Sequence, residues 1–510
     1  MSDRDIQRDI QKDDFWLPLF VVVLGAFAAI LNNSSVNVAL PKMMAIFGVS
    51  ADQIQWVLTA YMLASGVIIP VTGYLGDAWG TKRTYLIALV VFTAGSVLCG
   101  LAWNNNSMIA ARVIQGIGGG AIMPVSMAIV YRIVPRARIG FALGIWGMAA
   151  VTAPAIGPTL GGYVVEYMNW RFLFTLNVPV GIVAILLGSA LLPESPVKKG
   201  LKFDLWGFLT SSAGCFALLL ALSQGYKEGW DSYYIIMLLT FAAFMLVIFV
   251  LIELETPEPM LDLRLFKNKI FTISIFGGSL LNMGLFGGVF LIPLFTQNLM
   301  GKTAMETGLM LMPAALVTAV MMPVSGALFD RMGPRIVTFI GLVIVALGTL
   351  EFNKLSINST VFYVTLVATI RSLGMGLAMM PMTTAGMNTI ETKDVGRASA
   401  LSNVCRQVAA SFGIAILTAT MQGRQSLHLA HLTESLTLNS PALGLLQGAG
   451  EGASSVSFLY TLWGMAAKQS LVLAIDDTFL VAALLVAIAI PSAFFLGSGK
   501  RAPQGRASSG

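Results

Sequence analysis

Long apolar runs constrain this chain more than any other feature of its 510-residue sequence. Fourteen of them approach or exceed the roughly 20 residues that a membrane-spanning helix requires. They lie near residues 16–38, 53–75, 85–102, 107–130, 140–164, 171–192, 205–224, 233–252, 270–298, 305–329, 336–352, 360–386, 400–421 and 478–496. Backbone groups must be paired inside lipid, and the runs are continuous rather than alternating. The sequence therefore predicts an all-α integral membrane protein with 14 transmembrane helices.

Composition leaves no room for a separate soluble domain. Apolar residues make up 56% of the chain, about 286 residues, and fourteen spans would use about 280 of them. Charged residues make up only 11%, against roughly 25% in soluble domains. Three scattered cysteines and two histidines, His428 and His431, give no metal-binding spacing. We therefore expect neither an enzyme nor a nucleic-acid-binding protein, and no cofactor or metal.

The placement of basic residues predicts the orientation. If both termini are cytoplasmic, 21 loop Lys and Arg residues lie inside and seven lie outside. The other three of the 31, Arg112, Arg371 and Arg406, lie within spans. Such an excess is typical of cytoplasmic loops, so we interpret the net charge of +6 as a topology signal.

Two segments allow another interpretation. The first run could be a cleaved signal peptide, but its leader, residues 1–14, mixes acids with bases. The run at 456–474 contains Lys468, and we expect it to be an interfacial amphipathic helix rather than a fifteenth span. It ends the one long outer loop, residues 422–477.

A repeat divides the chain into two related halves. Residues 70–82 align with residues 323–335, a shift of 253, and Pro, Val, Gly, Leu, Asp and Gly are identical. Each copy ends the second helix of a six-helix set. The predicted organisation is an N-terminal tail 1–15, a six-helix bundle 16–192, a linker 193–269 with two extra transmembrane helices, a second bundle 270–497 that includes the outer loop 422–477, and a C-terminal tail 498–510.

The repeated loop has a chemistry of its own. Its glycines free the backbone for a tight turn, and its aspartate can cap the N-terminus of a neighbouring helix. We expect it to latch one half against the other, and the alternative is a hairpin held only by interfacial charges. The residues are Gly73, Asp77, Gly80, Lys82 and Arg83 in the first copy, and Gly326, Asp330, Gly333 and Arg335 in the second.

Further motifs lie in the fourth and fifth predicted helices and in the outer loop. They are Arg112-Val-Ile-Gln115-Gly116, Gly157-Pro158-Thr-Leu-Gly161-Gly162 and residues 424–434. With the repeated loop, they make the chain resemble the major facilitator superfamily, and within it the fourteen-helix drug:proton antiporters of the EmrB/QacA type. The resemblance covers essentially the whole chain. It implies the major facilitator fold, two six-helix bundles plus two inserted helices, in a bacterial cell (inner) membrane.

The resemblance also implies roles for residues within the spans. Arg112, with Gln115 one turn along, would take part in coupling proton movement to transport, although Arg112 could instead snorkel to the headgroups. Arg371 and Arg406 are further candidates, and Arg406 could instead hold inner helix ends together. Pro154, Gly157, Pro158, Gly161 and Gly162 would form a pivot that favours export, and the alternative is ordinary small-residue packing.

One departure from the family pattern changes the expected chemistry. Where members commonly carry an aspartate in helix one, this chain has Asn32, and no other span contains Asp or Glu well inside it. An amide cannot bind and release a proton, so a carrier such as Glu166 or Glu351 would be needed. A passage with three arginines and no carboxylate should favour neutral or anionic amphipaths. Asn32, Asn33 and Asn37 would supply hydrogen bonds there, or would only join helix one to a neighbour.

The predicted function is efflux of drugs or other small amphipathic organic compounds by alternating access, energised by a proton gradient. The alternatives are an uncoupled or differently coupled facilitator of a neutral or anionic metabolite, and a membrane sensor that no longer transports. The chain has no Gly-x-x-x-x-Gly-Lys-Ser/Thr loop, which excludes an ATP-driven pump within it. Besides the lipid bilayer, a membrane-fusion adaptor protein is a possible partner through loop 422–477.

Overall fold

The structure is a computed structural model that describes residues 15–435 and 456–497, apart from 136–137, 196, 199 and 202. It is all-helical over these residues, and 14 helices are long and apolar enough to cross a membrane, which confirms the predicted count. The predicted tails 1–15 and 498–510 lie outside the described residues, except for Phe15.

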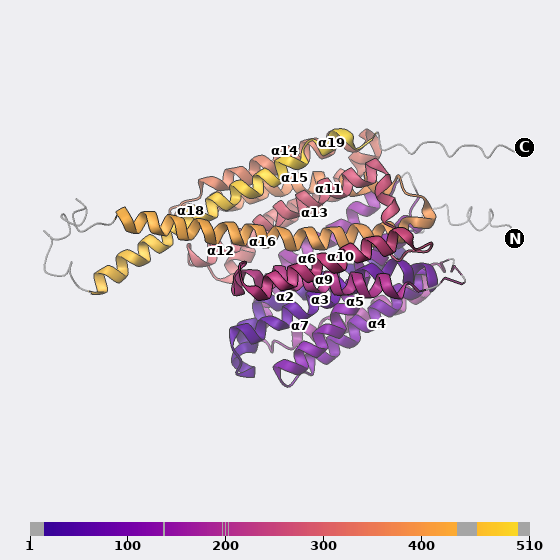
Figure 1. Ribbon diagram of the computed structural model, residues 1–510, viewed down its shortest axis with the longest axis horizontal. Coiled ribbons are helices and arrows are strands. Elements are labelled where there is room, and N and C mark those ends of the chain that lie inside the picture. The colour runs from indigo at the N-terminus through magenta and orange to yellow at the C-terminus, as the bar shows by residue number, and fades with distance from the viewer. Residues whose placement is uncertain are drawn as a thin grey trace, which may run out of the picture.

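The first six spans are α2 (Trp16–Phe47), α3 (Ala51–Ala78), α4 (Thr81–Gly100), α5 (Asn105–Ile133), α6 (Ile139–Tyr167) and α7 with α8 (Phe172–Thr175, Asn177–Leu191). The inserted pair is α9 (Leu205–Glu228) and α10 (Tyr233–Glu255). The last six are α11 (Lys269–Phe286) with η3 (Gly287–Leu291) and α12 (Ile292–Asn298), then α13 (Ala304–Met332), α14 (Pro334–Glu351), α15 (Val361–Met387), α16 (Val395–Ser435) and α18 (Val456–Ala489) with α19 (Ser492–Phe495). Figure 1 shows them running along one direction.

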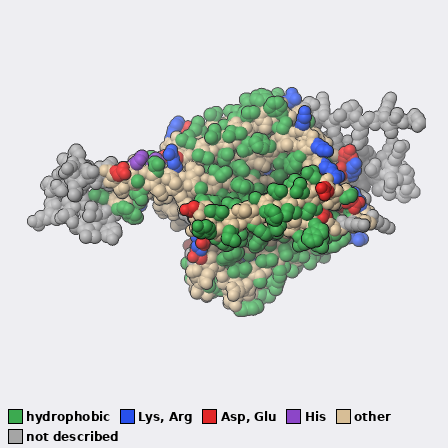
Figure 2. Space-filling view, viewed as in Figure 1, with side chains coloured by type: hydrophobic (Ala, Val, Ile, Leu, Met, Phe, Trp, Pro, Cys, Tyr) green, Lys and Arg blue, Asp and Glu red, His purple; other side chains and the backbone are tan. Residues whose placement is uncertain are grey.

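We name the two ends of the bundle by the chain. The terminal end is where α2 begins and α19 ends, and the distal end is the opposite one (Figure 1). Figure 2 shows charged side chains gathered towards the two ends, with hydrophobic side chains over the middle. This distribution fits a helix bundle whose middle lies in hydrocarbon.

Matched contacts support the duplication. Ser65 Oγ donates to the Gly116 carbonyl at 3.1 Å, and Thr318 Oγ1 donates to the Ser372 carbonyl at 3.2 Å. Thr318 follows Ser65 by 253 residues, and Ser372 follows Gly116 by 256. The helix pairs α3–α5 and α13–α15 are therefore packed alike, with a three-residue longer connection in the second half.

The two halves meet along two seams. In the α6–α13 seam, Gly140, Gly144 and Gly326 let the backbones touch, since a Cβ on Gly144 would lie 2.6 Å from the Met322 carbonyl oxygen. In the seam between α16 and the pair α3 and α5, Ser399 Oγ donates to the Pro124 carbonyl at 2.8 Å. Small residues allow such close approach between membrane helices.

Buried apolar residues join the halves at the terminal end. One cluster there includes Ile129 and Leu143 of the first half with Met387 and Leu401 of the second. The distal clusters around Trp170 and around Phe295 each draw on a single half. Among the described residues, the halves therefore share an apolar core at the terminal end and not at the distal end, although α6 and α13 also touch distally, where Gly308 meets Thr159.

Helices α16 and α18 extend well beyond the distal end of the other helices (Figure 1). With 41 residues at about 1.5 Å each, α16 is about 61 Å long, twice the hydrocarbon thickness of about 30 Å. Most of the predicted outer loop 422–477 is thus helical projection, and residues 436–455 lie outside the described part of the chain. The predicted separate interfacial helix at 456–474 is wrong, because this segment is continuous with the last span in α18.

The α6–α13 seam leads to a prediction for Gly326. A Cβ there would overlap the Gly140 carbonyl, so Gly326→Val should force the two helices apart at the terminal end and lower the detergent-solubilised protein's unfolding temperature. Gly423→Val is the matched control, because nothing lies within 4 Å of a Cβ at that helical position. Equal unfolding temperatures for the two variants would contradict the close seam.

Candidate functional site

Arg112 lies at the centre of a polar cluster within the first half. Its guanidinium is fully buried between α2, α3 and α5. Nε donates to the Val57 carbonyl at 3.0 Å, and Nη1 donates to Asn32 Oδ1 at 3.0 Å and to Gln115 Oε1 at 2.6 Å. Nη2 donates to Asn33 Oδ1 at 3.3 Å. Arg112 is therefore enclosed by protein and does not snorkel to a membrane surface.

The Arg112 cluster contains a cation without a matching anion. The acceptors around Arg112 are amide and carbonyl oxygens, and the ring of Tyr61 lies 4.2 Å from its guanidinium carbon. The described residues place no carboxylate in contact with it. The buried Asn32 Nδ2 also has no acceptor in the described part of the chain. A buried positive charge beside unused donors favours a partner with acceptor oxygens or negative charge.

Gln115 links Arg112 to α4 and reveals the counterpart of Arg371. Gln115 Nε2 donates to Ser96 Oγ at 2.7 Å, and Arg371 Nε donates to Thr349 Oγ1 at 2.9 Å. Thr349 follows Ser96 by 253 residues and Arg371 follows Gln115 by 256, the same two shifts found above. Arg371 thus occupies the position of Gln115, and the position of Arg112 is taken by the buried Ala368.

Arg371 donates hydrogen bonds to the backbone of α11. Its Nη2 donates to the carbonyls of Gly284 at 2.9 Å and Leu285 at 3.2 Å, next to the π-helical turn η3. Gly288 in that turn leaves the space that the guanidinium occupies. A π-helical turn interrupts the regular helical hydrogen bonds beside it, and Arg371 donates to the two carbonyls at this interruption.

Arg406 lies between the halves near the terminal end. Its Nη2 is 3.2 Å from Asn403 Oδ1 and 3.7 Å from Met127 Sδ of α5. The three arginines therefore have different partners, and the structure does not bring them together around one site. Of the three, Arg112 is the one that contacts the predicted asparagines.

The asparagines of α2 differ in exposure. Asn32 is buried, whereas Asn33 and Asn37 are exposed one helical turn apart on the distal half of the helix. An amide exposed at membrane depth is costly in lipid. The distal half is also where the two bundles share no apolar core.

The glycine and proline motif of the fifth span, α6, packs against α2. Pro158 has no N–H, which leaves the Pro154 carbonyl without its usual helical donor, and Ser34 Oγ supplies a hydrogen bond at 3.0 Å. Gly157 lies directly against Ser34, and a Cβ on Gly161 would be 2.8 Å from the Ser35 carbonyl oxygen. Gly162 faces Met305 more loosely. The motif thus joins α6 closely to α2 while α6 also forms a seam with α13.

Both repeated loops reach across to the opposite half. Asp330, at the end of α13, accepts from the backbone N–H groups of Gly140 at 3.3 Å and Phe141 at 3.2 Å in the first turn of α6. It caps that helix, as the sequence predicted for a neighbouring N-terminus. Gly333 begins α14 with φ of 82°, a conformation that favours glycine, and Arg335 is exposed.

Asp77, at the end of α3, contacts the equivalent first turn of α16. Its Oδ2 lies 3.2 Å from Arg397 Nε, and it is also 2.8 Å from Lys198 Nζ. Gly73 makes room for this approach, because a Cβ there would be 3.2 Å from the Arg397 Cα. In the same loop Gly80 has φ of 87°, Lys82 pairs with Glu194 at 3.2 Å, and Arg83 is exposed.

The remaining candidates lie near the distal end. Glu351 pairs with Lys354 at 2.9 Å, and Glu166 is exposed. His428 Nε2 is 2.8 Å from Asp477 Oδ2, which Arg424 also contacts at 2.7 Å, so these side chains tie α16 to α18. A search of the described residues finds no group of His, Cys, Asp and Glu that could hold a metal ion.

Comparison with known proteins identifies the family. The family model described as "Major Facilitator Superfamily" matches residues 22–414. The chain belongs to the major facilitator superfamily. It is 35% identical to the MFS-type transporter YhcA of Bacillus subtilis over 94% of this chain and 92% of that protein. It is 32% identical to a multidrug resistance protein B homolog of Mycobacterium tuberculosis, over 95% and 91%.

A solved structure supports the fold. The chain matches the proton:xylose symporter XylE with a TM-score of 0.59 at 13% identity, over 94% of this chain and 96% of that one. The predicted major facilitator fold is thus confirmed for this superfamily member, which is a multi-pass membrane transporter.

Sequence reasoning missed three contributors to these sites. Tyr61 and Ser96 complete the Arg112 cluster, and Lys198 joins Asp77 from the linker. Extending the repeat alignment at the same shift of 253 would have placed Ser96 opposite Thr349. Tyr61 and Lys198 carry no local signal, because tertiary packing alone brings them to these sites.

The arginine contacts predict different results for two similar substitutions. Lysine has one ammonium group and cannot reproduce the four donor contacts of Arg112 or the three of Arg371, so Arg112→Lys and Arg371→Lys should each lower the unfolding temperature. Because Arg112 lies beside the unused Asn32 donor, Arg112→Lys should also weaken binding of an anionic amphipathic dye, measured by fluorescence polarisation on purified protein. If folded Arg371→Lys lost as much dye affinity as Arg112→Lys, binding of the dye near Arg112 would be contradicted.

Proposed function

We propose that this superfamily member exports small amphipathic compounds by alternating access between its two six-helix halves. The observation that supports this most directly is the pair of crossed contacts, Asp77 with α16 and Asp330 with α6, at the end where the halves also share an apolar core. The distal clusters are confined to single halves. A transporter that has closed one end and can open the other would have this arrangement.

The orientation that we propose places the terminal end in the cytoplasm of a bacterial cell. The excess of basic residues in the terminal-end loops supports it. The structure would then represent the state closed to the cytoplasm. The similarity to a multidrug resistance protein B homolog supports export of drugs as the direction and substrate class.

The Arg112 cluster would be the substrate-selective part of the passage. Asn33 and Asn37 would face the passage on the distal side, with Arg112 and Asn32 behind them. Since this cluster presents a cation and free donors and its described contacts include no carboxylate, neutral or anionic amphipaths should bind better than lipophilic cations.

Coupling to the proton gradient is part of the proposal, and the carrier would lie outside the Arg112 cluster. The second candidate function is a facilitator without ion coupling, which the Asn32 amide favours because it cannot carry a proton. Proton flux into proteoliposomes, measured with an internal pH dye with and without a substrate gradient, separates the two. Substrate-dependent proton movement supports the antiporter, and substrate flux without it supports the facilitator.

Asn32→Asp tests the assigned selectivity. It would put a carboxylate about 3.0 Å from Arg112 Nη1, neutralising the cluster. Uptake of ethidium into inverted vesicles should rise and uptake of an anionic dye should fall. Asn358→Asp is the control for adding charge and should leave both rates unchanged, because Asn358 is exposed in the connection between α14 and α15, away from Arg112 and its partners.

The wild-type protein gives the direct comparison of substrate classes. Anionic and neutral dyes should be transported faster than ethidium at equal concentration. Faster ethidium transport by the wild type would overturn the proposed selectivity while leaving export itself standing. An adaptor protein at the projecting ends of α16 and α18 remains a prediction, which co-purification with a tagged chain from its native membrane would test.

A further inference from the structure

The connection between α8 and α9 is attached to the first repeated loop along its length. We call its described residues between 194 and 203 the strap, a set that leaves out 196, 199 and 202. At its start, Glu194 Oε1 lies 3.2 Å from Lys82 Nζ, and Ser195 Oγ lies 2.5 Å from Thr81 Oγ1. In its middle, the Lys198 N–H donates to the Asp77 carbonyl at 3.0 Å. At its end, the Tyr74 hydroxyl donates to the Leu201 carbonyl at 3.5 Å, and the Phe203 ring lies 5.1 Å from the Tyr74 ring. The strap thus follows the end of α3.

The inserted helix α9 is held to α3 as well. Lys227 near its distal end pairs with Asp52 in the first turn of α3 at 2.9 Å. Midway, Gly66 of α3 leaves space for Leu219 of α9. Ion pairs at both ends and packing between them attach the strap and α9 to the first half, while the other side of α9 lies against Phe412 and Ala415 of α16.

Asp77 is therefore shared between cations from two different bodies. Lys198 Nζ donates to Oδ2 at 2.8 Å from the strap. Arg397 Nε lies 3.2 Å from the same oxygen but makes no aligned hydrogen bond in the described structure. Asp77 itself is 3% exposed. If the seam opened at the terminal end, Arg397 would leave with α16, and Lys198 would stay.

We propose that Lys198 is a positioning residue of the transport cycle, which keeps Asp77 neutralised after Arg397 has left and so favours opening of the terminal end. This rests on the proposed alternating-access function. A buried carboxylate that loses its contacting cations is strongly unfavourable. Without Lys198 the open state would leave Asp77 with no cation in contact and with only the charge of Arg132 nearby. Arg397 acts in the opposite direction, because its contact exists only while the seam is closed.

The described part of the second half contains no cation equivalent to Lys198 at its repeated loop. Asp330 is held by two backbone N–H groups of α6, and the described residues place no Lys or Arg ion pair on it. Asp330 is already exposed, and opening would leave it in solvent, where a carboxylate needs no partner. The strap therefore serves the buried member of the pair of aspartates, and it is supplied by the segment that carries the two inserted helices.

Two neighbouring charges bear on the test. Arg132 of α5 reaches Thr81 at 3.5 Å, and its charge attracts Asp77 of the same half. This attraction would persist after opening and makes the effect of Lys198 smaller. Burial raises the pKa of Asp394, and Lys393, Lys198 and Arg397 oppose that rise, so Lys198 also attracts a carboxylate of the second half. That attraction favours closure and opposes the proposed effect, but Asp394 makes no ion pair with Lys198 among the described residues.

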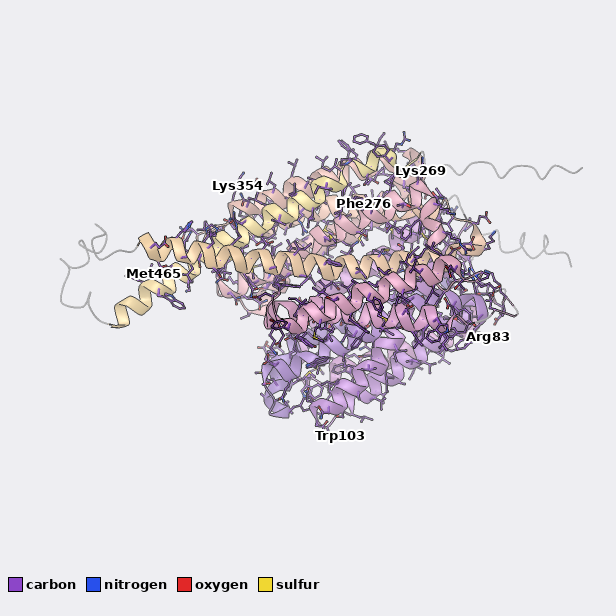
Figure 3. The ribbon with its side chains drawn as sticks, viewed as in Figure 1. Arg83, Trp103, Lys269, Phe276, Lys354 and Met465 are labelled. Carbon is purple, nitrogen blue, oxygen red and sulfur yellow. The ribbon has the colours of Figure 1, made fainter. Side chains whose placement is uncertain are left out.

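The test compares Lys198→Met with Arg397→Met in a variant whose three cysteines are replaced. Spin labels at Arg83 and Lys269 report the terminal end, and labels at Trp103 and Lys354 report the distal end (Figure 3). Lys198→Met should lower the population with separated terminal labels, and Arg397→Met should raise it, each by about two- to fivefold, as for a partly exposed ion pair. Lys198→Arg should restore the wild-type populations.

Lys227→Met is the matched control, since it removes an ion pair that joins α9 to α3 away from Asp77, and it should leave the populations unchanged. The Lys198→Met shift should be larger in an Asp394→Asn background, where the opposing attraction is gone. Shifts of the same sign for Lys198→Met and Arg397→Met, or no shift for Lys198→Met, would overturn the inference alone. A wild type that never separates its terminal labels, with any dye or pH gradient, would overturn alternating access as well.

Discussion

The structure depends on a pair of carboxylates that each end a helix in one half and contact the first turn of a helix in the other. Asp77 meets α16 and Asp330 meets α6. Helix N-termini carry unpaired N–H groups and partial positive charge, so an aspartate there is stabilised without a covalent link. Such contacts can be broken and remade, which packing of large apolar side chains cannot do as readily. These two contacts join the halves at the end where an apolar core is also shared. Breaking them would allow the halves to separate at that end.

The two halves share a fold but differ in the chemistry of their interiors. The first half buries Arg112 among amide oxygens, whereas the second places Ala368 there and moves its arginine one turn along, to the position of Gln115. Arg112 thereby lies beside an unused donor of Asn32, and Arg371 supports the π-helical turn in α11. The two halves share a scaffold, but their residues give the first half a buried cation beside an unused donor and the second half a support for a π-helical turn.

Much of the fold could be predicted from the sequence, because span length, loop charge and the repeated loop are local properties of the chain. The Asp330 cap also followed from the residues, since glycine and aspartate in a tight turn have few other uses. The site was less predictable. Three arginines within spans suggested one charged passage, but each has its own partners, and the partner that Lys198 provides to Asp77 comes from 121 residues away. The helical projection of α16 and α18 was missed because Lys468 resembled an interfacial charge, although it lies on a helix that continues into the last span.

Accessibility of the passage to each side tests the central claim most directly. A cysteine at Asn37, in a chain without its native cysteines, would be exposed on the distal half of α2. With the terminal end closed, a membrane-impermeant maleimide should label it when added outside intact cells and not when added outside inverted vesicles, whose outer face is the cytoplasmic one. Replacing Asp77 and Asp330 by asparagine should shift labelling toward the cytoplasmic side, which the maleimide reaches in inverted vesicles. Two results would contradict the account. One is labelling from the cytoplasmic side alone in the protein that keeps Asp77 and Asp330, and the other is equal labelling from both sides with and without these aspartates.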